Sequence, residues 1–547
     1  MNIMKENESL LREVYMTNWA PFWTDEVTIE NGGRYPLLLN RFHDHMEEYL
    51  IKGIVSITDR LRYVSYCCWV IGDIEYSLKC KHYYEFSEAF RRREAALAVG
   101  TYLLKPTTKI GNYTIYGRDY MRGRVDDIAR TYNTSFSVLP SNELGAYGQY
   151  YKGSLQNWGL TEITNDGIVH LTELGKKLYA IMDDTYKNCS YYKDYKGKKL
   201  VPGDVLVEWG SINQYDNITD NNHLKERNFF KNILFHMDRK NVPDGRRDTL
   251  MIYLDCIAEA ERKHHNFDAQ MVRSVMYYKK YVNVKGEIVE FNVSNFLQDT
   301  LYYWKIYHAH TYFRWWIEEY FKMFLRIIKM SPNGYSLSEV VNLVKAQVFN
   351  IAINKVTGKI LDYYNMVFID FVESIGAYSK QSEYLFEEYI SINSESDSIS
   401  HTSANMLMIL ATIYQEWIIM RQDSRYINIR MNYTDDFWFK DIMERIECYK
   451  NFSIQEVLYD ILEYFIIPRH NMAMYEKRDL RRCWFTKSGD KYQYQSDSTS
   501  IWSDGKYRII YNFLYDMGIT NVIDNTIILT NEGKILYKDL RENYYEK

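Results

Sequence analysis

The residues best spaced for catalysis are Asp244, Glu261 and Lys263, in the stretch PDGRRDTLMIYLDCIAEAERK at 243–263. At this spacing the two carboxylates could bind Mg²⁺ while the lysine aligns the attacking water, which is the chemistry of a metal-dependent nuclease. That chemistry needs Glu261 and Lys263 on a strand. The pattern around them is typical of a helix, on which their side chains diverge. A metal-dependent nuclease is therefore retained only as the alternative function.

Motifs for other kinds of catalysis do not occur in the sequence. It has no GxxxxGK[ST] or GxGxxG nucleotide loop, no GxSxG, no HExxH and no CxxC. His43 and His45 would share a face on a strand, but the surrounding pattern is helical, so they do not predict a metal site. We therefore expect no cofactor and no bound metal, and a non-catalytic protein in preference to an enzyme.

Charge limits how the chain can meet nucleic acid. The sequence has 67 Lys and Arg against 72 Asp and Glu, with a formal net charge of −5 and a pI of about 6.2. Attraction to phosphate over the whole surface is excluded, and any phosphate binding requires a local basic patch. The strongest candidate is GRDYMRGR, at 117–124, which supplies Arg118, Arg122 and Arg124 as predicted phosphate contacts.

Other arginines lie in predicted helices. Arg60 and Arg62 are two residues apart and point in different directions on a helix, so one of them is expected to reach a buried carboxylate such as Asp73 or Glu94. The run at 91–93 is read in the same way. A structural ion-pair network is favoured for these arginines, and a phosphate-binding patch remains the alternative.

One phrase occurs twice, more than 330 residues apart. GLTEITNDGIVHLTELGKKLY spans 159–179 and GITNVIDNTIILTNEGKILY spans 518–537. Each begins with a glycine suited to a left-handed helix cap, continues as a tight hairpin and reaches a threonine, Thr172 or Thr530, placed to cap a final helix. The hairpin of the second phrase is one residue shorter.

This order of helix, hairpin, capping threonine and helix resembles the C-terminal half of a winged-helix domain. The upstream helices are expected near 145–158 and 506–517. In that fold the upstream helix enters the major groove, where basic residues hold phosphates. Lys152, Lys506 and Arg508 are the predicted phosphate contacts, although neither helix is rich in charge. Docking onto another protein is left open as the second use of these units.

Periodicity predicts a mainly α, multi-domain helical protein with two winged-helix-like (α+β) units. Helical patterns cover 58–78, 83–104, 300–329 and 452–467, with Thr58 or Ser56 as the first cap and Pro468 as the final stop. Hairpins are expected at 282–293 and 483–495, and a polar loop at 391–400. The expected units are an N-terminal helical domain (1–108), a first winged-helix-like unit (109–190), a helical connector with a small hairpin (191–299), a central helical bundle (300–470) and a C-terminal winged-helix-like unit (471–547).

Cysteine usage and hydropathy predict the compartment. The seven cysteines are odd in number and form no metal-binding pair, which fits a reducing environment. The N-terminal segment lacks a basic stretch followed by an apolar run, and apolar stretches stay short of a bilayer span. We expect a soluble cytoplasmic protein with no membrane partner.

Several longer phrases are spread over most of the chain. They are YPLLLNRFHDHMEEYLIKGIVSITDRLRYVSY, EFSEAFRRREAALAVG, YYWKIYHAHTYFRWWIEEYF, RHNMAMYEKRDLRR and LYDMGITNV…ILTNEGK. They resemble a group of large bacterial proteins found among mobile-element and phage-defence genes, for which no activity is assigned. The resemblance implies a bacterial setting and a role in DNA-related defence.

Together these features predict a non-catalytic component of an anti-phage defence assembly. Its winged-helix-like units would bind duplex DNA, partner subunits of the defence complex, or both. The remaining alternative is a purely structural scaffold or a sensor of a phage protein. The sequence makes no prediction about oligomeric state.

Overall fold

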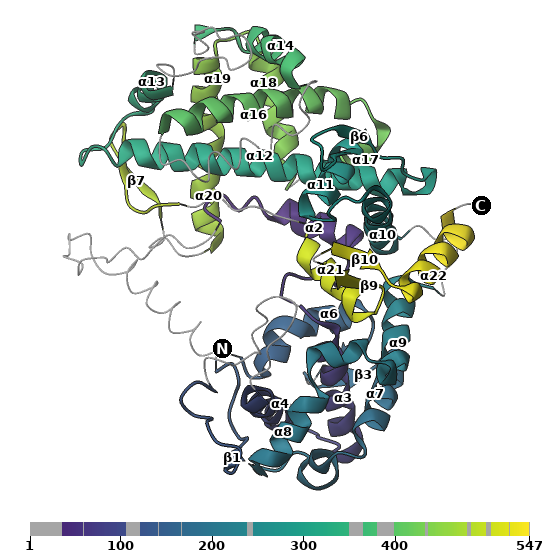
Figure 1. Cartoon of the computed structure of the whole chain (residues 1–547). Coiled ribbons are helices and arrows are strands. Elements are labelled where there is room, and N and C mark those ends of the chain that lie inside the picture. The colour runs from purple at the N-terminus through teal and green to yellow at the C-terminus, as the bar shows by residue number, and fades with distance from the viewer. Residues whose placement is uncertain are drawn as a thin grey trace, which may run out of the picture.

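The computed structural model describes residues 35–57, 59–104, 121–140, 142–165, 167–237, 244–348, 365–379, 399–432, 436–477, 483–498, 505–524 and 526–545. The chain is mainly helical, and every sheet within these ranges is a pair of antiparallel strands. Figure 1 shows a lower and an upper group of helices with a central layer between them. We call the two groups the lower lobe and the upper lobe.

The lower lobe is formed by residues 61–234. Its helices are α3 (Leu61–Ser77), α4 (Tyr83–Leu104), α6 (Lys152–Asn157), α7 (Glu173–Tyr186), α8 (Gly203–Ile212) and α9 (Leu224–Leu234). Helices α4 and α8 cross in close contact because glycines meet there. A Cβ on Gly100 would lie 2.0 Å from the carbonyl oxygen of Leu206, and one on Gly210 would lie 2.3 Å from the carbonyl carbon of Gly100.

The upper lobe is built around one long, largely buried helix, α12 (Gln298–Ile328). The predicted helix at 300–329 is confirmed, and Ile317, Phe321, Phe324 and Ile328 are all buried. The other helices of this lobe are α11 (Ala269–Tyr278), α13 (Leu337–Val348), α14 (Phe368–Ser379), α16 (Ile399–Met420), α17 (Ser424–Asn432), α18 (Trp438–Tyr449), α19 (Ile454–Ile461) and α20 (Ile467–Lys477).

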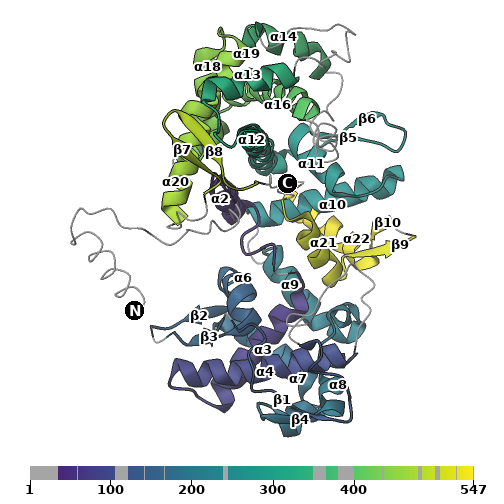
Figure 2. The same cartoon turned by 90° about the vertical axis from the view of Figure 1, so that its left-hand side faces the viewer.

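The central layer joins sequence ends that lie hundreds of residues apart. It consists of α2 (Arg41–Leu50), α10 (Gly245–Lys263), α21 (Tyr507–Asp516) and α22 (Asn531–Leu540), as Figures 1 and 2 show. The C-terminal helices therefore lie against helices from the first half of the chain, α21 against α3 and α22 against α10.

Five hairpins or ribbons complete the fold. The strands are β1 (Thr131–Asn133), β2 (Thr161–Ile163), β3 (Val169–Leu171), β4 (Leu200–Pro202), β5 (Lys280–Val282), β6 (Ile288–Glu290), β7 (Phe485–Ser488), β8 (Lys491–Tyr494), β9 (Thr520–Ile523) and β10 (Thr526–Leu529). Strand β1 pairs with β4, and the others pair in consecutive order. The predicted hairpins β5–β6 and β7–β8 are confirmed. Phe485 and Tyr492 pack against Phe324 of α12, so the β7–β8 hairpin lies with the upper lobe.

Two predicted helix ends are wrong. The helix expected to stop at Pro468 continues, through a π-helical turn at Leu462–Ile466, into α20. The wider turn changes the hydrogen-bond register just before the proline, where the missing N–H would otherwise interrupt the helix. Helix α3 begins at Leu61 with Arg60 as its cap residue, so Ser56 does not cap it, and Thr58 lies outside the described residues. Residues 391–398 of the predicted polar loop also lie outside them.

Candidate nucleic-acid interface

The two repeated phrases fold into matching local structures, which we call copy one (145–186) and copy two (506–540). Thr172 and Thr530 each cap the last helix, accepting a hydrogen bond from the backbone N–H three residues on, at 3.1 and 3.0 Å. Each threonine hydroxyl also donates to a glycine carbonyl, Gly159 or Gly518, at 2.6 Å in both copies. The predicted threonine caps are confirmed.

Glycines make this geometry possible in both copies. Gly159 and Gly518 both have φ of +69°, the left-handed conformation that ends a helix at low energetic cost. A Cβ on Gly175 or Gly533 would lie 2.1 Å from a backbone carbonyl oxygen, that of Leu160 or Ile519. Only glycine fits at these positions without a shift of the backbone.

Each copy also packs on one long helix in the same way. The N–H of Leu171, in strand β3, donates to Glu75 of α3 at 3.1 Å. The N–H of Leu529, in strand β10, donates to Glu261 of α10 at 3.4 Å. Helix α3 therefore supports the hairpin of copy one as α10 supports the hairpin of copy two. The sequence analysis missed this relation.

The upstream helix of copy two, α21, faces the interior of the protein. Nearly all of α21 is buried, and Asp516 at its end is fully buried against the start of α3. Its carboxylate accepts from Arg60 Nε at 2.9 Å and from the Leu61 N–H at 2.8 Å, so it caps α3 from a distance of 455 residues in sequence. Arg60 also pairs with Asp216 at 2.9 Å. This carboxylate supplies the cap that was expected from a nearby side chain.

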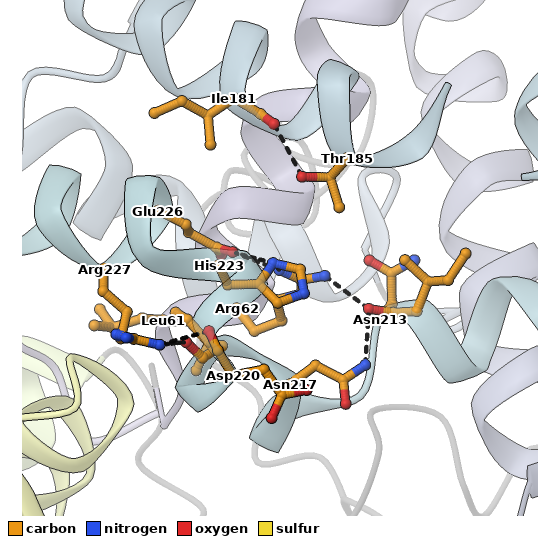
Figure 3. A network of polar contacts seen from close by, with 12 residues as sticks. Leu61, Arg62, Ile181, Thr185, Asn213, Asn217, Asp220, His223, Glu226 and Arg227 are labelled. Atoms are coloured by element: carbon orange, nitrogen blue, oxygen red, sulfur yellow. Dashed lines mark hydrogen bonds and ion pairs between the residues drawn. The ribbon is translucent and has the colours of Figure 1, made fainter. Parts of the chain in front are cut away.

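Buried ion pairs extend from this point through the lower lobe. Arg62 pairs with Glu226 of α9, and both side chains are about 1% exposed. Figure 3 shows this pair beside Arg227, whose guanidinium donates to the backbone carbonyls of Thr219 and Asp220, which precede α9. Arg227 also pairs with Glu532 of copy two at 3.2 Å. The structural network expected for these arginines is confirmed, but Arg60 and Arg62 are both buried, and their partners are not Asp73 or Glu94.

Copy one is held by a different kind of group. Glu94 of α4 is buried and accepts from the Tyr63 hydroxyl at 2.6 Å and from the Tyr147 N–H at 3.2 Å, in the π-helical turn Tyr147–Tyr151 that precedes α6. No ion pair to Glu94 occurs in the described part of the chain. Burial raises its pKa to about 7, and these hydrogen bonds oppose the shift.

The upstream helices of the two copies meet each other. Trp158, directly after α6, packs edge-to-face on Phe513 of α21, with ring centroids 5.8 Å apart. In α21 the buried residues include Asn512. In α6, by contrast, Gly153, Gln156 and Asn157 remain exposed. An accessible helix face is therefore present in copy one, whereas that of copy two is largely covered by the chain itself.

The predicted phosphate contacts of copy two are engaged within the chain. Lys506 is 18% exposed and pairs with Glu47 at 3.2 Å. Arg508 is 61% exposed and pairs with Asp59 at 3.2 Å. Lys152 is partly buried at the start of α6, and Arg118 lies outside the described residues. Lys506 and Arg508 lie at the start of α21 in the central layer, whereas Arg122 and Arg124 precede β1 in the lower lobe.

Arg122 and Arg124 are exposed at the far end of the lower lobe. They lie on the turn that precedes β1, and this turn is attached to the strand by the Tyr132 hydroxyl, which receives the N–H groups of Asp126 and Asp127 at 3.3 and 3.0 Å. Strand β1 pairs with β4, as the bottom of Figures 1 and 2 shows. We call residues 121–135 and 187–204 the basic ribbon.

Lysines and tyrosines alternate in the second half of the basic ribbon, in KNCSYYKDYKGKK at 187–199. Lys198 and Lys199 are exposed, and their carbonyl groups accept from Thr134 beside β1. Lys198 lies over the ring of Tyr195 at 5.1 Å. Lys196 is used internally, since it pairs with buried Asp73 at 2.6 Å. The sequence analysis missed this segment, although its lysine density and interleaved tyrosines were a visible signal.

The basic ribbon differs in charge from the whole chain. Its two segments carry eight Lys and Arg side chains and four Asp side chains, in a protein whose formal net charge is −5. Exposed cations beside aromatic rings can contact phosphates and stack on bases. The arrangement therefore fits binding of a nucleic-acid backbone better than catalysis.

The residues of the nuclease alternative are separated. Asp244 caps α10 at one end, accepting from the Arg247 N–H at 3.0 Å, while Glu261 and Lys263 lie at the other end of the same helix. Seventeen residues of helix span roughly 25 Å, too far for a shared metal ion. Glu261 instead binds Leu529 and Lys534 of copy two. No cluster of three metal-ligating side chains occurs in the described ranges.

Comparisons with known proteins add no relative: no family model, no curated protein and no solved structure matches the chain. None of the helices in the described ranges combines the length and the apolar character needed to cross a bilayer.

Proposed function

We propose that the chain is a non-catalytic component of a bacterial anti-phage defence assembly, and that it binds nucleic-acid phosphates through the basic ribbon. The observation that carries this proposal is the set of exposed cations on the basic ribbon, with Arg122 and Arg124 before β1 and Lys198 and Lys199 before β4. In a chain of negative net charge, such a local surface is where phosphate contacts are favoured.

Within this proposal the two copies are winged-helix-like modules with different partners. Copy two binds the chain's own helices through Asp516, Glu532 and Lys534, and so joins α3, α9 and α10. Copy one offers an exposed helix face that is small and uncharged, with Gln156 and Asn157. A surface of this kind suits a partner subunit better than a phosphate backbone.

A scaffold that binds only protein is the second candidate function, and the uncharged face of copy one favours it. The two candidate functions differ in whether the protein shows salt-dependent binding to DNA. Phosphate contacts release counterions, so binding to DNA weakens steeply as salt rises, whereas a protein scaffold gives no such binding. The nuclease alternative has no support from the separated residues on α10.

The test is binding of the full-length chain to fluorescent 20-bp duplex and 20-nt single strands at several salt concentrations. We expect binding that weakens about tenfold or more between 50 and 200 mM salt. The double variant Lys198→Ala with Lys199→Ala should bind these nucleic acids more weakly than the parent. The matched control is Lys285→Ala with Lys538→Ala, which removes two exposed lysines elsewhere and should have little effect. Absence of binding, or equal loss in both double variants, would contradict the proposal.

A further inference from the structure

A pocket opens in the upper lobe, where α11, α12, α16 and α17 meet at the right of Figure 1. Its volume is about 340 Å³, at the low end of the range of about 300–1,000 Å³ that is typical of small-molecule sites. It lies in the opposite lobe from the basic ribbon, so its role is independent of the proposed function. The lining used below consists of Tyr277, Lys279, Gln298, Tyr302, Lys305, Glu416, Ile419, Met420, Asp423 and Arg425.

Three cations converge on one end of this pocket. Lys305 pairs with Glu416 at 3.0 Å, and Arg425 pairs with Asp423 at 2.7 Å, so these two cations are each matched by a carboxylate. Lys279, in contrast, donates to the side-chain amide of Gln298 and has no ion pair among the described residues. The lining therefore holds three cations and two carboxylates, and Asp299, outside the lining, pairs with Arg425 at 3.1 Å.

The unmatched ammonium is in an unfavourable environment. Burial lowers the pKa of Lys279, and the neighbouring charges of Arg425 and Lys305 lower it further, while Asp423 opposes them. An anion at this point would relieve both effects, because it stabilises the charged form of the lysine. Lys279 is also held in place: it ends α11 in the left-handed conformation, with φ of +58°.

Aromatic and apolar side chains line the pocket beside these cations. The ring of Tyr302 lies 4.3 Å from the Arg425 guanidinium, and its hydroxyl donates to the Met420 carbonyl at 3.0 Å, which fixes the ring. Tyr277 is buried behind Lys305, 5.7 Å from the ammonium. Ile419 extends the apolar surface outward and is 62% exposed. A planar ring can pack here while an attached anionic group reaches Lys279.

We propose that this pocket binds a small phosphorylated molecule that carries a planar ring, of the mononucleotide class. The phosphate lies against the ammonium of Lys279 and accepts the hydrogen bond now made to Gln298. The ring packs between Tyr302 and Ile419. The size of the pocket and its single unmatched cation favour one phosphate over two or three.

The test uses the full-length protein and three probes measured by calorimetry: adenosine monophosphate, adenosine and inorganic phosphate. We expect the monophosphate to bind about tenfold or more tightly than adenosine, which lacks the charged group, and more tightly than phosphate, which lacks the ring. Adenosine binding as tightly as its monophosphate, phosphate binding as tightly as either, or no binding of any probe would overturn the assignment.

Variants locate the site. Lys279→Ala should weaken binding of the monophosphate about tenfold or more, and Lys279→Arg should restore most of it because the charge returns. Ile419→Glu places a carboxylate at an exposed edge without burying it and should abolish binding even if Lys279→Ala folds poorly. Lys285→Ala, at the exposed tip of the β5–β6 hairpin, is the control and should bind normally. Monophosphate binding that survives both Lys279→Ala and Ile419→Glu would place the ligand elsewhere.

Discussion

Copy one and copy two have the same hydrogen bonds inside but opposite electrostatics where they meet the rest of the chain. Both are capped by a threonine that also binds a glycine carbonyl at 2.6 Å. Copy one is anchored by Glu94, a buried acid without an ion pair in the described part of the chain. Copy two is anchored by Asp516, which is buried and paired with Arg60. The motif therefore specifies a local shape, and its surroundings decide what that shape is used for.

The upstream helices of the two copies differ in how much of their surface is exposed. The upstream helix of copy two is covered by α3 and by Trp158 of copy one, so its residues hold the lower lobe to the central layer. The upstream helix of copy one keeps Gln156 and Asn157 on the surface. The repeated structure is thus used once inside the protein, and we propose that its other copy binds a partner.

The largest expected effect is on the anchor of copy two. Asp516→Ala removes the buried carboxylate that pairs with Arg60 and caps Leu61. Breaking a buried pair in this way typically costs about 3–5 kcal/mol of unfolding free energy. The urea midpoint, followed by tryptophan fluorescence, should fall accordingly. Arg508→Ala, which breaks an exposed pair, should cost less than about 1 kcal/mol, and equal losses would refute the contrast.

The anchor of copy one should respond to pH. Because the pKa of Glu94 is raised from 4.5 to about 7 in the folded state, its contribution is fully present below pH 4.5 and is lost as pH rises through 7. Glu94→Gln keeps the acceptor but cannot ionise. At pH 8.5 the variant should be more stable than the parent by up to about 3 kcal/mol, and at pH 4.5 the two should be alike. A stability difference that does not change with pH would show that Glu94 is not the titrating group.

The glycines beneath the hairpins test whether the copies are truly equivalent. Gly175→Ala and Gly533→Ala each place a Cβ 2.1 Å from a backbone oxygen and force a shift. Such overpacking typically costs about 1–3 kcal/mol. We expect similar losses in urea midpoint for both variants. In Gly123→Ala nothing lies near the added Cβ, but the φ of +74° strains the backbone. This variant therefore measures the cost of backbone strain without overpacking.

The smallest expected effect is on the threonine caps. Thr172→Ala and Thr530→Ala each remove a cap, which typically costs about 1 kcal/mol. Serine at either position should restore most of the loss because it keeps the hydroxyl. A loss confined to one copy, measured by thermal unfolding of both alanine variants, would show that the shared hydrogen bonds differ in energetic weight.

Local features of the fold could be predicted from the sequence, and long-range ones could not. Thr172, Thr530, Gly159 and Gly518 lie within a few residues of the groups they bind, so spacing alone identifies them. Asp516 caps a helix 455 residues earlier, and no local pattern records that contact. The helix end predicted at Pro468 was wrong because the π-helical turn that accommodates the proline has no clear sequence signal.

The candidate site was predictable only in part. Arg122 and Arg124 were identified from their spacing, and they are exposed as expected. The pairing of β1 with β4, which adds Lys198 and Lys199 from 65 residues away, could not be read from short strands of three residues. Glu261 was taken as a candidate metal ligand because its type fits that role, yet its contact with Leu529 is made across 268 residues.

The most direct test of the account is the salt dependence of duplex binding in three proteins: the parent, Lys198→Ala with Lys199→Ala, and Arg508→Ala. Each phosphate contact contributes about 0.9 to the slope of log affinity against log salt. The account predicts a slope lowered by up to about 2 in the lower-lobe double variant and unchanged in the copy-two variant. A slope that is unchanged in the double variant but lowered by Arg508→Ala would contradict it.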